Sequence, residues 1–148
     1  MNKTLVLTKD QMKQKLQRMA WEIYEQNHSE DSIIVAGIAK RGFVLAKEIA
    51  KTLANISSIK VKLVSINLDK DYPLDNPIQV DKIDFTNQTV VLVDDVLKTG
   101  KTMMYGSQYF MQKALKKLTT AVLIDRNYKR YPIKADVVGL SLSTTMQE

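Results

Sequence analysis

The chain of 148 residues contains no cysteine and only one histidine, three prolines and five glycines. Without cysteine it can form neither a disulfide nor a thiolate metal site. No apolar run is long enough to cross a membrane and no secretory segment is apparent, so we expect a cytoplasmic protein without membrane attachment. The single histidine, His28, follows a predicted helix among polar residues, and no acid–base partner lies near it in the sequence. It is therefore a surface residue rather than a candidate catalyst.

What the composition does provide is a core and a positive charge. Apolar residues make up 45% of the chain, which is enough for one sizeable core, so we predict a single domain over residues 1–148. The formal net charge is +6, and the 22 basic residues are spread along the chain rather than grouped. This charge suits an anionic ligand or a nucleic acid, although ordinary surface lysines would produce it as well.

The stretch Val90–Thr102 is the most informative part of the sequence. Val90–Val93 are four apolar residues typical of a buried strand, and Asp94 and Asp95 follow directly. Thr99–Thr102, with the sequence Thr-Gly-Lys-Thr, are typical of a turn that opens a helix. Ligands of open α/β sheets lie at the carboxyl ends of strands, and free amides at a helix N-terminus favour phosphate. The stretch therefore predicts a site for a sugar phosphate.

One alternative for this stretch is excluded by spacing. Gly-Lys-Thr also occurs in the loop that binds nucleoside triphosphates, but that loop requires a glycine five residues before its second glycine. Here that position is occupied by Asp95. A pair of aspartates after a strand could also be a solvated strand end, and on its own the pair is not diagnostic.

A second candidate anion site follows the strand predicted at Ile33–Gly37. A short basic turn leads there into a helix whose apolar residues recur at helical spacing up to Leu53. A strand, a basic turn and a helix again form an anion-binding arrangement, which favours diphosphate binding over a merely solvated turn. The candidate residues are Ala39, Lys40, Arg41 and Gly42.

The remaining pattern alternates helices and strands. A capping box at Thr8 and Gln11 begins a helix that ends near Asn27. Further predicted elements are a strand at Val61–Ile66, a helix at Met103–Leu118, a strand at Ala121–Ile124, a polar loop at Asp125–Pro132 and a short strand at Ala135–Gly139. This order predicts a doubly wound α/β fold with a mainly parallel sheet.

Residues 67–88, which we call the lid segment, show no regular pattern and contain two prolines. A compact domain seldom carries so long an irregular connection unless it is a lid or a binding loop. A flexible lid and a short extra β-hairpin both remain open for this segment.

The stretch Val90–Thr102 resembles the motif by which type I phosphoribosyltransferases bind phosphoribosyl diphosphate (PRPP). The resemblance implies a transfer of the phosphoribosyl group from PRPP to a nucleobase, with Mg²⁺ accompanying the diphosphate. It implies that Asp94 and Asp95 are catalytic, binding the ribose hydroxyls and favouring positive charge on the ribose, while the amides of Lys98–Thr102 hold the 5-phosphate. The implied PRPP-binding residues are Asp94, Asp95, Val96, Leu97, Lys98, Thr99, Gly100, Lys101 and Thr102.

The order of segments from Thr8 to Thr145 further resembles the pyrimidine operon attenuation protein family, which also has uracil phosphoribosyltransferase activity. GIAKRGFVLAKEIA is similar to its diphosphate loop, in which a cis peptide would fall at Ala39–Lys40, and IDRNYKRYPIKADVVG is similar to its hood. The resemblance implies a hood over about residues 125–148 together with the N-terminal segment. It implies base contacts from Val137 and Val138, while Arg126 could donate to a base carbonyl. A homodimer or larger homo-oligomer is also expected.

Two departures from that family bear on function. Leu68-Asp69-Lys70-Asp71 stands where the family has Tyr-Arg-Asp-Asp, and Trp21 stands where RNA-binding members have a histidine. Three hypotheses therefore remain: an enzyme that joins PRPP to a nucleobase, with uracil preferred and a purine as the alternative; a PRPP-sensing RNA-binding regulator; and a binding protein that has lost turnover. An RNA-binding surface would include Lys13, Lys15 and Arg18.

The identity of the base is the least determined feature. Hypoxanthine-type phosphoribosyltransferases, which share Thr-Gly-Lys-Thr-Met, carry an aspartate near the purine where this chain has Lys98. A charged lysine can donate to the carbonyls of uracil but cannot accept a hydrogen bond from a ring nitrogen. This favours a pyrimidine over a purine, unless Lys98 faces solvent or phosphate and has no part in the choice of base.

Overall fold

The structure is a computed structural model that describes residues 7–142. The predicted hood therefore extends beyond the described residues, as does the resemblance around Thr145. The elements in chain order are α1 (Lys9–Gln26), β1 (Ser32–Ile38), α2 (Ala39–Ile56), β2 (Lys60–Asn67), β3 (Gln79–Val80), β4 (Thr89–Leu97), α3 (Lys101–Met111), β5 (Lys117–Asp125) and β6 (Val137–Ser141). No helix within residues 7–142 is long and apolar enough to cross a membrane.

The strands form one mixed sheet in the order β3-β2-β1-β4-β5-β6. All neighbouring pairs are parallel except β3, which runs antiparallel to β2. The chain builds outward from β1 to β2 and β3 and then returns to place β4 on the other side of β1, so the winding reverses between β1 and β4. Open α/β sheets bind ligands at such a reversal, at the carboxyl ends of the strands.

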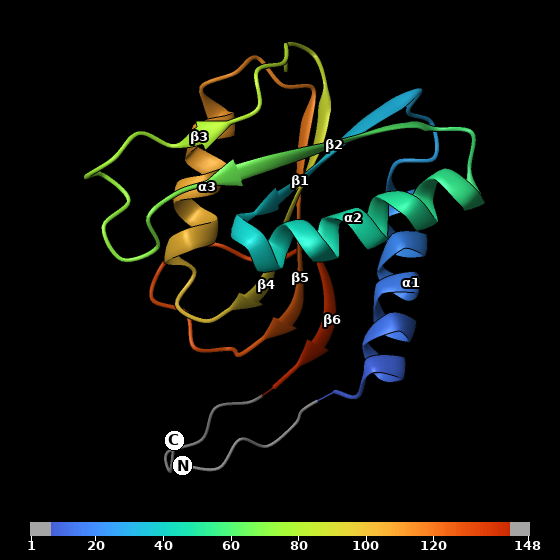
Figure 1. The fold of residues 1–148 in the computed structure, drawn as a ribbon, viewed down its shortest axis with the longest axis horizontal. Coiled ribbons are helices and arrows are strands. Elements are labelled where there is room, and N and C mark those ends of the chain that lie inside the picture. Colours follow the sequence, from blue (N-terminus) through green and yellow to red (C-terminus); the bar gives the residue numbers. More distant parts are fainter. Residues whose placement is uncertain (1–6, 143–148) are drawn as a thin grey trace.

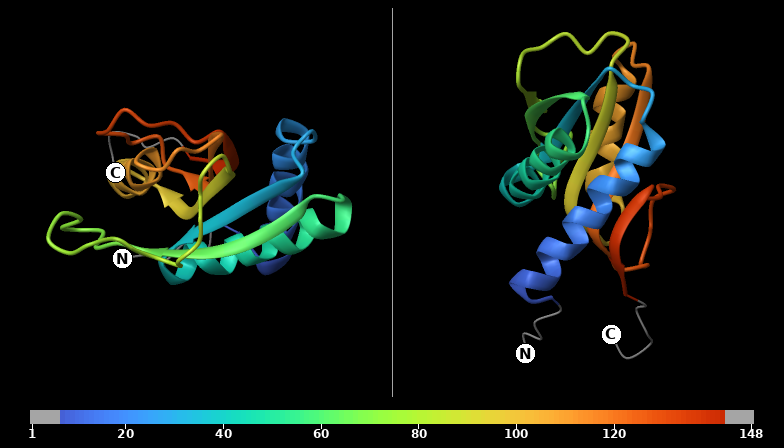
Figure 2. Two further views of the ribbon diagram at one scale, coloured as in Figure 1. Left: turned by 90° about the horizontal axis from the view of Figure 1, so that it is seen from above. Right: turned by 90° about the vertical axis from the view of Figure 1, so that its right-hand side faces the viewer.

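Helices cover both faces of the sheet (Figures 1 and 2). Helices α1 and α2 pack on one face, where Ile23 and Ile49 are fully buried in one cluster with Val91 of β4. Helix α3 covers the other face, where Phe110 is fully buried in a cluster with Leu92. Because successive side chains of a strand point to opposite faces, the neighbouring residues Val91 and Leu92 serve the two cores. This confirms the doubly wound α/β prediction.

Helix α1 follows the sequence prediction closely. The Thr8 hydroxyl accepts a hydrogen bond from the amide of Gln11 at 3.1 Å, and the Gln11 side chain accepts one from the amide of Thr8 at 3.0 Å. This reciprocal capping box satisfies two amides that a helix start otherwise leaves free. The buried face is formed by Leu16, Met19, Ala20 and Ile23.

The predicted helix Met103–Leu118 is wrong at its C-terminal end. Helix α3 stops at Met111, and β5 already begins at Lys117, four residues before the predicted strand. After the helix the chain turns back to the start of β4, where the amide of Lys116 donates to the carbonyl of Gln88 at 2.9 Å. Leu118 therefore pairs with Val90 in the parallel ladder instead of extending the apolar face of α3.

Two further strand boundaries differ from the prediction. β4 continues through Asp94 and Asp95 to Leu97, so the acids lie within the strand and not beyond it. β6 begins at Val137 because the preceding residues are held by hydrogen bonds to Thr120, whose amide donates to the Asp136 carboxylate at 2.9 Å. The apolar run predicted only part of β4, because pairing with the long neighbouring strand β5 extends it.

The lid segment contains one short hairpin strand and is otherwise irregular. β3 pairs with β2 through Ile66 and Val80, which confirms the hairpin interpretation for these residues. The Asp81 carboxylate accepts a hydrogen bond from the amide of Ser65 at 3.0 Å and reinforces this pairing. The rest of the segment loops out beside α3 (Figure 1). Its function as a mobile lid stays a prediction.

Candidate functional site

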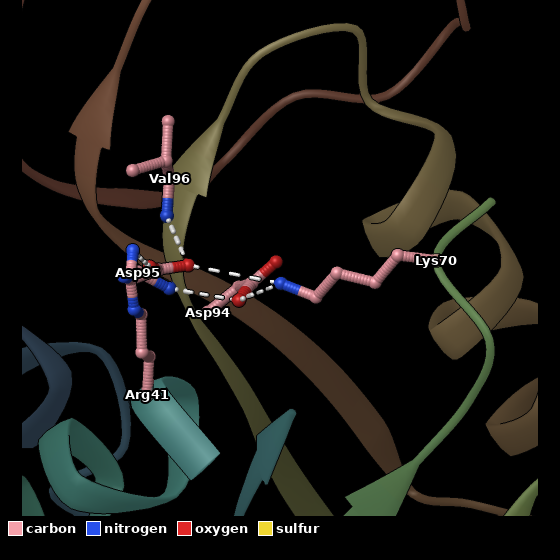
Figure 3. Close-up of polar contacts among 5 residues, drawn as sticks. All are labelled: Arg41, Lys70, Asp94, Asp95 and Val96. Carbon is pink, nitrogen blue, oxygen red and sulfur yellow. Dashed lines mark hydrogen bonds and ion pairs between the residues drawn. The ribbon is translucent and has the colours of Figure 1, made fainter. Parts of the chain in front are cut away.

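The two aspartates lie where β4 extends past its neighbour β1. The pairing of β1 with β4 ends at Gly37 and Val93, so the next two residues of β4 stand at the rim of the winding reversal. The Asp94 side chain is only 2% exposed and that of Asp95 is 18% exposed. The amide of Asp95 donates to the Asp94 carboxylate at 2.9 Å, and the amide of Val96 donates to the Asp95 carboxylate at the same distance (Figure 3). Local backbone bonds therefore fix the orientation of both carboxylates.

Burial makes Asp94 an unusual acid. Removal of its carboxyl from water is the main cause that raises its pKa, to about 7 in all; the ammonium of Lys70 acts in the opposite direction, and the charge of the neighbouring Asp95 adds to the increase. Near neutral pH, ionisation of Asp94 therefore costs more free energy in the folded protein than in water. Perturbed acids of this kind concentrate at functional sites.

Two cations reach the acid pair from different elements (Figure 3). The guanidinium of Arg41, in the first turn of α2, lies 3.7 Å from the Asp95 carboxylate. The ammonium of Lys70, in the lid segment, lies 3.5 Å from the Asp94 carboxylate and 3.9 Å from that of Asp95. The diphosphate candidates and the lid segment thus meet at the acid pair.

The start of α2 packs closely on the end of β4 because of two glycines. A Cβ on Gly37 would lie 2.5 Å from the Cα of Phe43, and a Cβ on Gly42 would lie 2.8 Å from the carbonyl oxygen of Val93. Both distances are too short for a side chain. The helix N-terminus, with the four predicted diphosphate residues in its first turn, is therefore held directly beside the acid pair.

The cis peptide predicted at Ala39–Lys40 is wrong, since residues 7–142 contain no cis peptide bond. The chain instead turns from β1 into α2 through Ala39 itself, which has a φ of 57°. Residues with side chains seldom adopt this left-handed conformation, and such strain is typical of functional sites. No separate turn stands between strand and helix, so Lys40 and Arg41 belong to the helix.

The second helix N-terminus of the site belongs to α3. Gly100 precedes it with a φ of 92°, and a Cβ there would lie 2.7 Å from a methyl carbon of Ile133. The Thr99 carbonyl accepts hydrogen bonds from the amides of Arg130 and Tyr131 at 2.8 and 3.0 Å. In the described residues no side chain caps the helix at Gly100. The amide of Lys101 donates to the Thr99 hydroxyl at 3.2 Å, and the amides that follow it in the first turn remain suited to a phosphate.

The loop 125–134 thus holds in place the turn at Thr99 and Gly100, which is predicted to bind the phosphate. The amide of Arg126 also donates to the carbonyl of Leu97 at 2.9 Å. Lys98 is exposed, and with the nearer Arg130, which hydrogen-bonds the Tyr128 hydroxyl, it lowers the pKa of Tyr128. This exposure leaves open whether Lys98 contacts the base or faces solvent or phosphate.

The predicted base contacts lie on β6 and differ in accessibility. Val137 is fully buried in the core beneath α1 and α2, whereas Val138 is half-buried on the face that α3 covers. Of these two side chains, that of Val138 is the more accessible. Base binding by Val137, Val138 and Arg126 stays a prediction.

A role that the sequence did not suggest belongs to Arg18. Its guanidinium donates to the carbonyls of Val138 and Gly139 at 3.1 and 2.5 Å and also pairs with Glu22 on the same helix. β6 is an edge strand, and a carbonyl on the side of it that faces away from β5 needs another partner. The side chain thus anchors the edge strand to α1, and no sequence signal separated it from Lys13 and Lys15.

We expect Arg18→Ala to loosen β6. The amides of β5 and β6 should exchange with solvent several-fold faster, because the edge strand loses about 1 kcal/mol of hydrogen bonding from α1. Hydrogen exchange followed by mass spectrometry measures this, with Lys13→Ala, an exposed change on the same helix, as the matched control. Unchanged exchange in β6 would show that these hydrogen bonds do not hold the strand.

The donor set bears on the metal that the resemblance implies. Residues 7–142 contain no group of three or more His, Cys, Asp or Glu side chains that could hold a metal ion. Two carboxylates can contribute oxygen ligands to Mg²⁺, directly or through water, when the remaining ligands come from phosphates. The site therefore fits a magnesium ion that arrives with a diphosphate, and does not form a cage of its own.

Comparisons with known proteins agree with this geometry. The family model for the phosphoribosyl transferase domain matches residues 4–148. The chain is 33% identical over 153 residues to the bifunctional protein PyrR of Fusobacterium nucleatum, covering 97% of this chain and 86% of that protein. It is 32% identical to the bifunctional protein PyrR of Limosilactobacillus reuteri, with the same coverage of both chains.

Among solved structures, the hypoxanthine phosphoribosyltransferase of Trypanosoma cruzi superposes with a TM-score of 0.83 at 17% identity, covering 96% of this chain and 83% of that one. A hypoxanthine-guanine phosphoribosyltransferase of Bacillus anthracis reaches a TM-score of 0.78 at 20% identity, covering 97% and 84%. At these identities the structures establish the fold. The match of the family model to residues 4–148 shows that this chain belongs to the phosphoribosyl transferase domain family.

Proposed function

We propose that the chain binds PRPP and transfers its phosphoribosyl group to a nucleobase. The observation that carries the proposal is the acid pair of β4, which lies at the winding reversal of the sheet between the N-termini of α2 and α3. One helix start is suited to the 5-phosphate and the other to the diphosphate. The carboxylates between them are suited to the ribose.

In the transfer, the bond from ribose C1 to the diphosphate oxygen breaks, a bond to the base nitrogen forms, and that nitrogen loses its proton. Asp94 and Asp95 accept hydrogen bonds from the 2- and 3-hydroxyls, and their charge favours the positive charge that develops on the ribose. The first turn of α2, with Lys40 and Arg41, receives the leaving diphosphate. Bound Mg²⁺ would neutralise phosphate charge.

Uracil is our preferred base. The resemblance of the diphosphate and hood segments to a family with uracil phosphoribosyltransferase activity supports it, as does the cation Lys98 in place of an acid. The fold likeness to hypoxanthine enzymes does not argue for a purine, because it lies at 20% identity or below.

We expect uridine monophosphate to be the main product when uracil, hypoxanthine, guanine and adenine compete for PRPP and Mg²⁺. Separation of the products by liquid chromatography measures the ratio, and the Asp94→Asn/Asp95→Asn double variant is the control for background. Preferential formation of a purine nucleotide would contradict the uracil assignment and leave the PRPP site intact.

The second candidate is a PRPP-sensing regulator that binds RNA. Both relatives are named as bifunctional proteins, which supports a second function beside the transfer. Of the basic residues predicted to contact RNA, Lys13 is exposed. Arg18 is engaged with β6, so the predicted RNA surface is smaller than expected. Titration of a pyrimidine leader RNA over a salt series tests it, since specific binding requires a sequence preference as well as a salt dependence.

A further inference from the structure

Two lysines connect the lid segment to the candidate site, one from each side. Lys70 reaches from the lid segment to Asp94 and Asp95 (Figure 3). Lys101, in the first turn of α3, reaches from the site to the lid segment, where its ammonium donates to the carbonyl of Asp71 at 2.8 Å. Each side of the contact thus supplies one cation to the other.

The tip that carries Lys70 is a preformed turn. The Asp69 carboxylate accepts hydrogen bonds from the amides of Asp71 and Tyr72, both at 3.0 Å. Beyond the turn the packing is sparse: Pro73 is buried, but Tyr72 is 66% exposed and Leu74 is 80% exposed. Because few apolar contacts hold the tip, we expect the polar contacts of Lys70 and Lys101 to contribute most to its stability.

Charge balance shows what Lys70 does at the acid pair. Asp95 has a partner in Arg41, but that side chain is 85% exposed, so the pairing is weak. Asp94 is almost fully buried, and Lys70 is the ammonium that lies beside it. A buried carboxylate without a counter-charge is costly, so this contact stabilises the ionised acid pair in the ligand-free protein.

The ribose hydroxyls of the proposed substrate must approach the same carboxylate oxygens. An ammonium 3.5 Å from Asp94 leaves no room for a hydroxyl between them. We propose that Lys70 is an internal counter-ion that occupies the ribose position at Asp94 and Asp95, so that a sugar phosphate binds only after the lid tip is released. This inference rests on the proposed function, because it takes the acid pair as the ribose site.

The test compares the wild type with Lys70→Met, which keeps the length of the side chain and removes its charge. The probe is ribose 5-phosphate, which has no diphosphate, so loss of Lys70 cannot remove a diphosphate contact. A ligand that binds only the released form has its affinity reduced by the fraction that is released. Calorimetry should therefore show at least threefold tighter binding to Lys70→Met. Lys82→Met, an exposed change in the same segment, should bind like the wild type.

A second readout follows the lid tip without any ligand. Chymotrypsin is suitable because Leu74 is exposed and the substitution would remove a trypsin site. Cleavage after Leu74 should be at least threefold faster in Lys70→Met than in the wild type or Lys82→Met. Equal cleavage and equal or weaker ribose 5-phosphate binding would overturn the inference alone. If the wild type bound neither ribose 5-phosphate nor PRPP, the proposed function would be overturned together with it.

Discussion

Asp94→Asn is expected to stabilise the protein above pH 7 and to weaken its binding of PRPP. Burial holds the pKa of Asp94 at about 7, above the ordinary value of 3.8, so the folded state binds this proton more tightly than the unfolded state. The stability that the protonated carboxyl provides is complete below pH 4 and is lost as the pH rises to about 7. Asparagine is never ionised, so the variant avoids this loss, which we expect to be on the order of 4 kcal/mol.

Thermal unfolding at pH 5 and pH 8 measures the effect. The gain of Asp94→Asn over the wild type should be larger at pH 8 than at pH 5. Asp84→Asn is the control of opposite sign, because hydrogen bonds from Thr86 lower the pKa of that exposed carboxyl and no gain is expected there. A variant that is less stable than the wild type at pH 8 would contradict the account of Asp94.

The same variant should bind PRPP at least tenfold more weakly, since it loses a negative charge beside the ribose. A change that raises stability and lowers binding identifies a residue kept for function at a cost to the fold. For Asp94 the structure already rules out the alternative of a solvated strand end, because Asp94 is among the buried residues.

Gly42→Ala is expected to damage the fold and the site together. The added Cβ would lie 2.8 Å from the carbonyl oxygen of Val93, a backbone atom that cannot rotate away. The first turn of α2 would have to move off β4 at the residue that precedes the acid pair. Such overpacking costs about 1–3 kcal/mol, which urea unfolding measures. PRPP binding should weaken as well, because the start of α2 is displaced.

Gly106→Ala is the matched control within a helix. Its Cβ would lie 3.2 Å from a terminal carbon of Leu92 and 3.4 Å from one of Ile38, and both side-chain ends can shift. Alanine favours the helix by up to about 1 kcal/mol, which offsets the crowding. We expect a change in stability within about 1 kcal/mol and unchanged PRPP binding. Equal damage from the two substitutions would show that the contact between Gly42 and Val93 is not special.

The sequence predicted the parts of the fold that local chemistry determines. The capping box of Thr8 and Gln11 and the apolar spacing in α1 required no tertiary information, and the apolar runs of β1 and β4 marked the centre of the sheet. The boundaries that failed depend on distant partners. Helix α3 ends early because β4 draws the following residues into a parallel pair at Leu118.

The candidate site was predictable as a set of segments, but not in its contacts. The order of apolar strand, acids and Thr-Gly-Lys-Thr points to the ligand class without structural information. The left-handed Ala39, the reach of Arg18 to β6 and the approach of Lys70 to the acids arise from pairs of segments far apart in the chain. Periodicity and spacing describe one segment at a time, so they cannot predict contacts between distant segments.

Calorimetric titration with PRPP and Mg²⁺ tests the central claim most directly. The claim is that the carboxylates of Asp94 and Asp95 bind the ribose between two helix N-termini. The wild type should bind, and the folded Asp94→Asn/Asp95→Asn variant should show at least a hundredfold weaker affinity, equivalent to about 2.7 kcal/mol. Equal affinity of the two proteins, with the variant shown to be folded by circular dichroism, would contradict the claim.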